Sequence, residues 1–226
     1  GPEYVNRIYG SLEKNVSVPF TYTIVSDDFD GIRPEVKTIP LNGFDFFSHQ
    51  PKDKVWTREK MSYFKHFQEG RNVWMDLDIL IHKDITDEVT GPCEKPTFIW
   101  NHWNPLERSY DWYGKGGSCH VNSSFVMWDG SNGMELFNFL EQNEDKAFFT
   151  YKSYDKLLFY QCHRKNMMHY WSKDFVSNYN RENFKLKGKI SIFNTSHIQR
   201  NKGIHEVAFE LHEADKWVQE LWTSYS

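Results

Sequence analysis

The sequence has few cysteines, no long apolar run and no secretion signal, and each of these absences excludes a class of protein. Its three cysteines, Cys93, Cys119 and Cys162, are too few and too far apart for a disulfide framework or a CxxC metal site. No apolar stretch approaches the roughly 20 residues of a membrane-spanning helix. No basic start followed by an apolar middle indicates a signal peptide. These features predict a soluble protein whose thiols stay reduced.

Neither positive nor negative charge is in large excess. The chain has 27 Lys and Arg against 31 Asp and Glu, a net charge of −4 with the ten histidines neutral. This balance argues against binding nucleic acid mainly through a large basic face, and against a polybasic membrane binder. Aromatic residues, in contrast, are abundant at 17%. The simplest interpretation is a well-filled core, and a second one is a cleft in which some of them stack on sugars or bases.

The 226 residues are enough for one α/β domain with a full core. Runs of β-branched and aromatic residues predict strands at 20–25, 36–39, 72–75, 97–100, 121–128 and 190–193. Apolar residues at helical spacing predict helices at 2–12, 57–67, 133–142, 154–164 and 215–222. Because helices and strands alternate, we expect an α/β fold with a mostly parallel, mixed sheet flanked by helices, in a single domain over residues 1–226.

The strongest local signal is a pair of carboxylates, Asp76 and Asp78, at the end of a short apolar strand. Residues i and i+2 of a strand point to the same side. Both carboxylates can therefore face one cation at the edge of the sheet where α/β folds bind ligands. Carboxylate oxygens suit Mg²⁺ or Mn²⁺, which also hold substrate phosphates. A solvated acidic turn is the alternative interpretation.

Further polar residues follow a predicted strand or open a predicted element. His197 and Lys202 come after the last strand, where His can ligate Mn²⁺ and Lys can meet a diphosphate; both are otherwise ordinary surface residues. Asn122 lies at the polar start of an apolar strand, where it can bind a ligand hydroxyl. Asp155 opens a helix as a base, as an orienter of hydroxyls, or only as a favourable charge at the helix N-terminus.

Taken in order, these motifs resemble GT-A-fold glycosyltransferases. The strand ending in DLD at 76–78, the NSSFVMW strand at 122–128, the helix led by Asp155, and the last strand leading to His197 and Lys202 are similar to glycosyltransferase family 8 and its bacterial and phage relatives. The resemblance spans nearly the whole chain and implies a GT-A-like (Rossmann-like) fold. Relatives begin with a strand that contacts the nucleotide base, so we expect the first strand of the usual fold to be absent.

The resemblance also implies a metal site and a donor site. Asp76 and Asp78 hold Mn²⁺ (or Mg²⁺) against a nucleotide-sugar donor in such enzymes, and His197 matches their third protein ligand. Asp76 also lies near the sugar nucleotide, and Lys202 matches the lysine that neutralises the diphosphate. Lys60 falls where these enzymes place a basic residue near the donor.

Asn122 and Asp155 are the catalytic residues that the resemblance implies. Asn122 matches the strand that faces the donor sugar, and Asp155 matches the acidic residue that meets donor or acceptor hydroxyls. The chain departs from the family pattern in two places. Lys156 follows Asp155 where relatives often have Gln, and Gly203 follows Lys202 where they have Pro.

These observations predict a metal-dependent glycosyltransferase that moves a hexosyl or pentosyl group from a UDP-sugar to an acceptor hydroxyl. We expect the acceptor to be a glycan, a protein, or a modified nucleic-acid base for a phage protein. It would enter along the aromatic loop 100–113, where Trp100, Trp103 and Trp112 stack on it. Two other classes fit: a non-catalytic sugar- or nucleotide-binding module on a degenerate transferase fold, and a metal-dependent phosphoesterase. We expect a cytoplasmic location, or the host cytoplasm for a viral protein.

Overall fold

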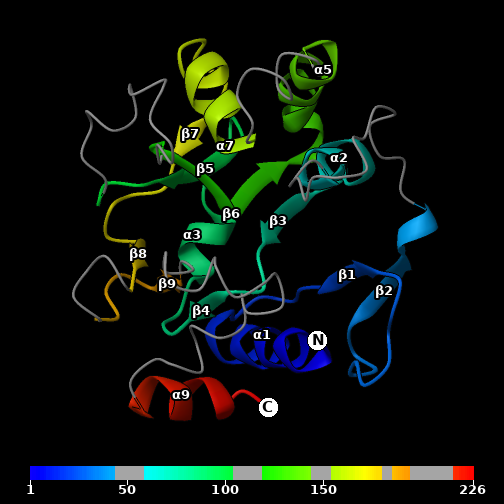
Figure 1. The fold of residues 1–226 in the computed structure, drawn as a ribbon, viewed down its shortest axis with the longest axis vertical. Coiled ribbons are helices and arrows are strands. Elements are labelled where there is room, and N and C mark those ends of the chain that lie inside the picture. Colours follow the sequence, from blue (N-terminus) through cyan, green and yellow to red (C-terminus); the bar gives the residue numbers. More distant parts are fainter. Residues whose placement is uncertain (44–58, 104–118, 144–153, 180–184, 194–215) are drawn as a thin grey trace, which may run out of the picture. The chain divides into compact units, whose positions relative to one another are not determined.

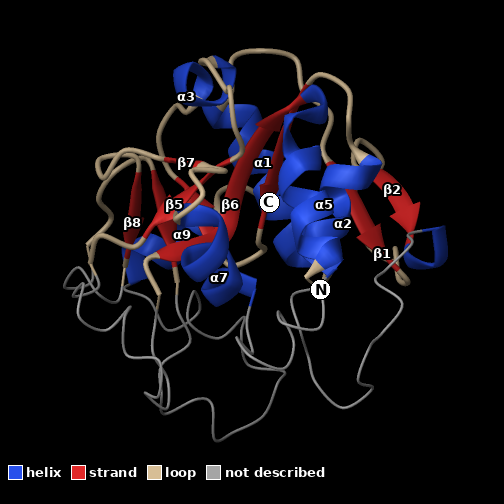
Figure 2. Cartoon of the chain, turned by 90° about the horizontal axis from the view of Figure 1, so that it is seen from above, coloured by secondary structure: helices blue, strands red, loops and turns tan. Residues whose placement is uncertain are grey.

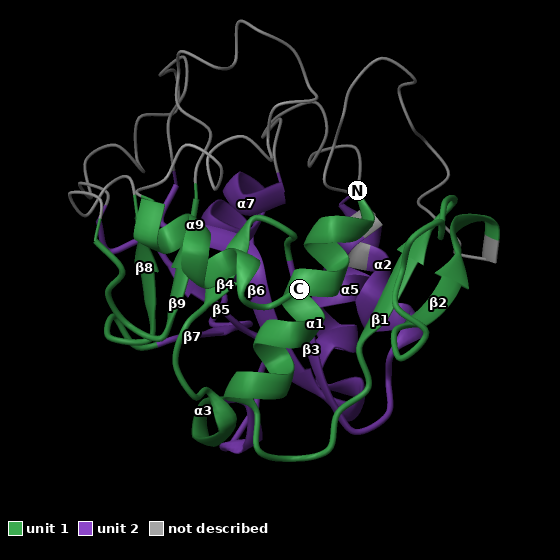
Figure 3. Ribbon diagram, turned by 90° about the horizontal axis from the view of Figure 1, so that it is seen from below, with its two compact units in different colours: residues 1–43, 76–88, 172–226 green, residues 44–75, 89–171 purple. Residues whose placement is uncertain are grey.

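Helices and short strands alternate along the chain, which confirms the predicted α/β class (Figures 1 and 2). The structure, a computed structural model, describes residues 1–43, 59–103, 119–143, 154–179, 185–193 and 216–226. The chain divides into two compact units, unit 1 with residues 1–43, 76–88 and 172–226 and unit 2 with residues 44–75 and 89–171 (Figure 3). The single domain over 1–226 stays a prediction. No helix among the described residues is long and apolar enough to cross a membrane.

Unit 1 carries short strands in two small sheets. Its described elements are α1 (Pro2–Asn15), β1 (Thr23–Ser26), β2 (Lys37–Pro40), the 3-10 helix η1 (Leu41–Gly43), β4 (Ile79–Ile81), β8 (Val176–Asn178), β9 (Ile190–Ile192) and α9 (Lys216–Thr223). β1 and β2 pair in parallel. The other sheet has the order β4-β9-β8, with β4 antiparallel and β8 parallel to β9. Helix α3 (Thr86–Thr90) follows β4 at the boundary of the two units.

Helix α1 and helix α9 are held by one buried cluster. α1 begins with a proline in its first turn and buries one apolar stripe, as the sequence predicts. The cluster joins residues of both helices to the β4–β9 sheet: Tyr4, Leu80, Tyr179, Phe193, Val218, Trp222 and Tyr225. The Arg7 guanidinium stacks on Trp222, 4.0 Å from the ring centroid, and so covers the edge of this cluster.

Unit 2 is built on a sheet of strand order β3-β6-β5-β7. Its described elements are α2 (Glu59–His66), β3 (Arg71–Met75), β5 (Thr97–Trp100), β6 (Val121–Asp129), the 3-10 helix η2 (Gly130–Gly133), α5 (Met134–Gln142), α7 (Tyr154–Leu157), the π-helix η4 (Leu158–His163) and β7 (His169–Tyr170). β6 pairs antiparallel with both β3 and β5, and β7 pairs in parallel with β5. A single buried cluster joins this sheet to α2, α5, α7 and η4.

The described sheets are mixed, with parallel and antiparallel pairs in equal number. The pairs β1–β2, β5–β7 and β8–β9 are parallel, whereas β3–β6, β5–β6 and β4–β9 are antiparallel. A parallel majority is therefore not seen among the described strands. The expectation rested on the alternation of helices and strands, and it missed β4, β7 and β8, whose two or three residues are too short to show a period.

A polar network inside unit 1 crosses the β4-β9-β8 sheet. Ser191 Oγ on β9 lies 2.9 Å from Ser177 Oγ on β8 and 3.2 Å from Nε2 of His82, which follows β4. Ser177 also donates a hydrogen bond to the Lys187 carbonyl at 2.7 Å. Burial lowers the pKa of His82 to about 4, and the charge of Lys83 acts in the same direction. The buried imidazole of His82 is therefore neutral at neutral pH.

We predict that acid weakens the fold through His82. The folded pKa lies below the ordinary 6.5, so between these two pH values the unfolded chain binds a proton that the folded chain does not. The free energy of unfolding should fall as pH drops through this window, by up to about 3 kcal/mol, and His82 should add no pH dependence above about pH 7. Urea unfolding at about pH 7.5 and pH 5 measures this. The variant His82→Gln should lose less stability on acidification than the wild type, and an equal loss would contradict the prediction.

Gly10, in helix α1, should tolerate no side chain. A Cβ on Gly10 would overlap the main-chain carbonyl of Tyr225, and a main-chain group cannot rotate out of the way. Gly10→Ala is expected to lower the free energy of unfolding by about 1–3 kcal/mol, measured by thermal or urea unfolding. Gly1→Ala is the control, because nothing lies within 4 Å of its added methyl. Equal stability of the two variants would show that α1 does not approach Tyr225 so closely.

Candidate functional site

Asp76 and Asp78 lie in the turn between the end of β3 and the start of β4, within unit 1. Both side chains are half-buried, whereas Leu77 between them is 42% exposed. The Asp78 carbonyl accepts a hydrogen bond from the Phe193 amide at 3.3 Å, which ties this turn to the end of β9. The two carboxylates therefore follow a strand as predicted, but a turn rather than a continued strand holds them.

The charge of Asp78 acts on the buried cluster of unit 1. The pKa of Tyr4 is raised to about 12, chiefly by burial, then by the charge of Glu3, with a smaller contribution from Asp78; Arg7 opposes the rise. Tyr4 itself is 7% exposed and packs on Trp222, with ring centroids 4.7 Å apart. A carboxylate beside such an apolar wall attracts a cation more strongly than it would in open water, because the local dielectric constant is lower.

Asp76 and Asp78 carry the type of oxygen that divalent metal ions bind. Half-buried carboxylate oxygens, one residue apart, suit Mg²⁺ or Mn²⁺. Within the ranges that the structure describes, no group of three or more His, Cys, Asp or Glu side chains could hold a metal. His197 and Lys202, predicted as the third ligand and the diphosphate-binding lysine, lie outside the described residues, so both assignments stay predictions.

Unit 2 brings Asn122 and Asp155 to the same stretch of β6. Asp155 Oδ1, at the start of α7, accepts a hydrogen bond from the Ser123 amide at 3.1 Å. Asn122 Oδ1 accepts one from the Ser124 amide at 2.8 Å. Both predicted catalytic residues are thus held by the main chain of β6 next to one another. These hydrogen bonds are enough to explain the positions of both side chains, without a catalytic role.

A break in strand pairing explains why these amides need side-chain acceptors. The register between β5 and β6 shifts between Thr97 and Ile99, and Ile99 pairs with Asn122. On the other side, β6 pairs with β3 only as far as Phe125. Buried amides that lose their strand partner must find another acceptor. Such β-bulges are common next to functional sites, where they re-aim side chains.

Sequence reasoning missed Asn101, which follows β5 and is 7% exposed. Its amide donates to the His120 carbonyl at 2.6 Å, and its side-chain Nδ2 donates to the Cys119 carbonyl at 3.0 Å. Burial raises the pKa of the Cys119 thiol, and the charge of Asp155 adds to the rise. Asn101, Cys119 and Asp155 are therefore neighbours at one end of β5 and β6. A polar residue directly after a strand is the signal that would have pointed to Asn101.

Trp100, at the start of the predicted acceptor loop, is packed among other rings. Its centroid lies 4.8 Å from His120, 4.8 Å from Tyr170 and 5.2 Å from His163. His163 Nδ1 and the Tyr170 hydroxyl are 2.9 Å apart, and burial lowers the pKa of His163. Trp100 therefore forms part of the core of unit 2. Trp103 is half-buried, and Trp112 lies outside the described residues.

Lys60 lies in the first turn of α2, in the same unit as Asn122 and Asp155. It is half-buried, as is Lys156 directly after Asp155. A basic residue near a bound diphosphate would stabilise its charge. The predicted contact of Lys60 with the donor stays a prediction.

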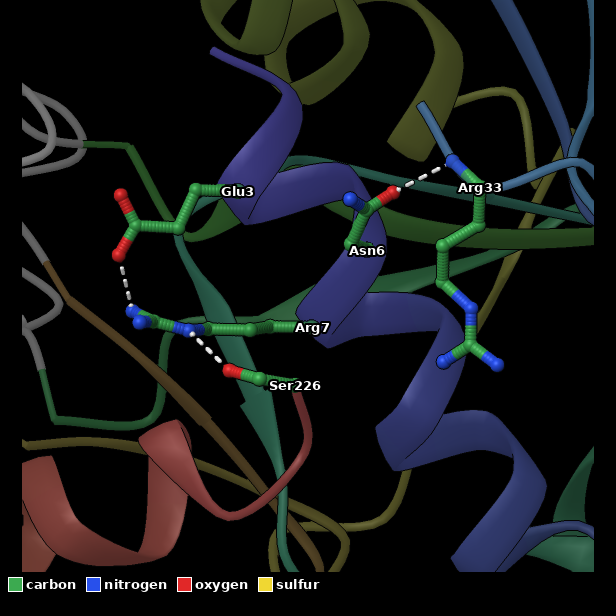
Figure 4. A pocket seen from close by; sticks show the side chains of 5 residues that line it. All are labelled: Glu3, Asn6, Arg7, Arg33 and Ser226. Carbon is green, nitrogen blue, oxygen red and sulfur yellow. Dashed lines mark hydrogen bonds and ion pairs between the residues drawn. The ribbon is translucent and has the colours of Figure 1, made fainter. Parts of the chain in front are cut away.

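A pocket that the sequence did not predict opens in unit 1. It has a volume of about 420 Å³ and is lined by Glu3, Asn6, Arg7, Arg33 and Ser226 (Figure 4). Its two arginines are already paired, Arg7 with Glu3 and Arg33 with Glu13 and Glu35. Asn6 is used as well, since it bonds the main chain of Gly31 and Arg33. The Arg33–Glu13 pair joins α1 to the segment between β1 and β2, and the three ion pairs together neutralise the positive charge that would attract an anion.

Comparison with known proteins finds likeness in structure alone. No protein-family model and no curated protein sequence matches the chain. The galactosyltransferase LgtC, solved with donor and acceptor sugar analogs, superposes with a TM-score of 0.60 at 9% identity, over 99% of this chain and 92% of that one. The glycosyltransferase GlyE of Streptococcus pneumoniae TIGR4 gives 0.61 at 12% identity, over 99% of this chain. An active-site mutant of LgtC gives 0.54 at 11% identity.

These matches confirm the predicted GT-A-like fold. They extend over nearly the whole of the chain, and the chain spans 57% of the length of GlyE. At 9–12% identity the likeness concerns the fold and says nothing of individual side chains.

Two variants of Asp155 should separate the effect of its hydrogen bond with the Ser123 amide on stability from the effect of its charge. Asp155→Asn keeps an oxygen that accepts the Ser123 amide, so its free energy of unfolding should stay within about 0.5 kcal/mol of the wild type. Asp155→Ala leaves the amide without this acceptor and should cost about 1–3 kcal/mol. Urea unfolding of the two variants measures the difference. If Ala and Asn destabilise equally, the bond does not hold α7 to β6.

Proposed function

We propose that this chain is a metal-dependent glycosyltransferase, related to glycosyltransferase family 8, that transfers a sugar from a UDP-sugar to an acceptor hydroxyl. The observation that carries the proposal is the half-buried pair Asp76 and Asp78 directly after a strand of a GT-A-like fold. LgtC and GlyE, which have this fold, are a galactosyltransferase and a glycosyltransferase. A carboxylate pair at this place is what a diphosphate-bearing donor requires, because a divalent cation must offset its charge.

We assign the metal to Asp76, Asp78 and His197. Both carboxylates are half-buried, and the charge of Asp78 acts on the buried Tyr4, so that the attraction of Asp78 for a cation is stronger than in open water. A bound divalent ion would act as a Lewis acid on the departing nucleoside diphosphate. Lys202 would offset part of the charge of the diphosphate as a point charge.

Asn122, Asp155 and Lys60 are proposed to contact the donor from unit 2. Asn122 Oδ1 already accepts the Ser124 amide, so the side chain offers its Nδ2 hydrogens to an oxygen of the sugar. Asp155 is fixed through Oδ1 by the Ser123 amide, which orients its carboxylate before substrate arrives. Such preorganisation is what positions a reacting group without loss of entropy at the moment of reaction.

The acceptor is proposed to be a hydroxyl of a glycan, of a protein or of a modified nucleobase. The transferred group is a hexosyl or pentosyl group. The segment after β5 begins with Trp100, whose ring is packed against His120 and Tyr170. Trp103 is therefore a better candidate for stacking on the acceptor than Trp100.

Turnover of UDP-sugars with Mn²⁺ tests the proposal. Asp78→Ala and His197→Ala are each expected to lower the rate of donor hydrolysis by about 100-fold or more, since each removes a metal ligand. A chelator should abolish wild-type turnover, and added Mn²⁺ should restore it. The control is Glu220→Gln, whose exposed carboxylate on α9 pairs only with Lys216 among the ion pairs of the described residues; it should retain wild-type rates.

Two outcomes would contradict the proposal in different ways. Turnover by Asp78→Ala and His197→Ala at the wild-type rate would show that the metal assignment is wrong. Binding of UDP with Mn²⁺ and no turnover of any UDP-sugar would favour a binding module on a transferase fold. Calorimetry with UDP, with and without Mn²⁺, distinguishes this second case.

A further inference from the structure

The side chain of Asn101 is bonded at only one end. Its Nδ2 donates to the Cys119 carbonyl at 3.0 Å. A carbonyl can only accept a hydrogen bond, so the orientation of this amide is fixed: nitrogen toward Cys119 and oxygen away from it. The oxygen, Oδ1, is buried, and no residue in the described parts of the chain donates a hydrogen bond to it.

A buried amide oxygen without a donor is uncommon and calls for an explanation. Burying this oxygen costs free energy, and no hydrogen bond from a described residue offsets that cost. The backbone of Asn101 gives no reason for this arrangement, because its amide is bonded to the His120 carbonyl like that of an ordinary strand residue. The missing hydrogen bond therefore concerns the side-chain oxygen Oδ1 and not the main-chain amide.

Asn132 shows how the same side chain looks in a purely structural role. It also lies in unit 2, and its Nδ2 also donates to a cysteine carbonyl, that of Cys93, at 2.7 Å. Its Oδ1, however, accepts a hydrogen bond from the Asp129 amide at 3.1 Å. Both ends of Asn132 are thus used within the protein, whereas Oδ1 of Asn101 is left for another partner.

The place of Asn101 narrows the choice of that partner. The side chain is bonded to the Cys119 carbonyl, and Asp155 accepts a hydrogen bond from the Ser123 amide, four residues further along the chain. Asn122, near the start of β6, is three residues beyond Cys119 in the chain, and it pairs with Ile99 of β5. Asn101 therefore follows the end of β5 and lies beside the start of β6, where Asn122 and the Ser123 amide bonded by Asp155 also lie.

We infer that Asn101 is a sugar-binding residue, and that its Oδ1 accepts a hydrogen bond from a hydroxyl of the sugar carried by the nucleotide donor. This inference rests on the proposed function and adds to it a residue and the direction of one hydrogen bond. A neutral amide oxygen needs a donor hydrogen, which a sugar hydroxyl has and an ionised diphosphate lacks. A site built to bond a hydroxyl also rejects a ligand without it, since the oxygen is then left unpaired.

Calorimetry with UDP, UDP-glucose and UDP-galactose in the presence of Mn²⁺ tests this inference on the full chain. The quantity compared is the ratio of the Kd for UDP to the Kd for whichever UDP-sugar the wild type binds more tightly. Asn101→Ala should lower this ratio by about tenfold, because the variant binds the UDP-sugar more weakly. The Kd for UDP should stay within about twofold of the wild type. Retained binding of UDP also shows that the variant is folded.

Two further variants separate the hydrogen bond from packing. Asn101→Leu keeps nearly the same side-chain volume and removes the acceptor oxygen, so its ratio should fall by about tenfold, as in Asn101→Ala. If Asn101→Ala does not fold, this variant decides, because an unchanged ratio in Asn101→Leu overturns the inference. Asn132→Ala is the matched control, and it should lower the midpoint of thermal unfolding and leave the ratio unchanged.

An unchanged ratio in Asn101→Ala would overturn the inference and leave the proposed function intact. An equal change in Asn132→Ala would overturn it as well, since the effect would then be one of stability. If the wild type binds neither UDP nor either UDP-sugar, the proposed function itself fails and the inference fails with it.

Discussion

Unit 2 depends on one requirement: each buried main-chain amide of β6 must find an acceptor. β3 meets it along Phe125–Asp129. Toward the start of β6 the register with β5 shifts, and the acceptors come from side chains instead, those of Asn122 and Asp155. The position of these two side chains is thus explained by strand pairing alone. The same bonds fix their orientation, however, and a fixed orientation is what a sugar-binding side chain needs.

In Asn101, only the nitrogen end of the side-chain amide has a hydrogen-bond partner among the described residues. Its Nδ2 is bonded to the Cys119 carbonyl, and the amide of Asn132 shows that this chain can satisfy both ends of such a side chain when it is structural. The difference between the two asparagines is therefore informative, because of the two side-chain oxygens only that of Asn101 lacks a donor among the described residues. A buried oxygen with no donor among the described residues points to a ligand more directly than the volume of a pocket does. The ion pairs of the pocket around Arg7 and Arg33 illustrate the point.

The sequence predicts the longer elements because each has a period to read. β5 at 97–100 and the helix after Gly133 lie where the apolar pattern places them, and α1 is longer than predicted by one turn. The helix from Tyr154 changes to a π-helix at Leu158, a change that apolar spacing cannot reveal because both helices bury a similar stripe. The order of motifs predicts Asp76, Asp78, Asn122 and Asp155. It cannot predict the unbonded oxygen of Asn101, which depends on a contact with Cys119 that the shifted β5–β6 register creates.

The fold by itself does not decide between transfer and binding, since one fold carries many functions. The two proposed roles make different demands on the chain. Holding a nucleoside diphosphate needs charge, which Asp76 and Asp78 would supply through a cation in unit 1. Transferring a sugar also needs the sugar to be oriented, which neutral hydrogen bonds achieve more selectively than charge, because a missing hydroxyl leaves a buried atom unpaired. Asn101 and Asn122 are side chains of this second kind, whereas Asp155 is a carboxylate held by the Ser123 amide. Under our proposal, the cation would therefore hold the diphosphate, and the two amide side chains would orient the sugar.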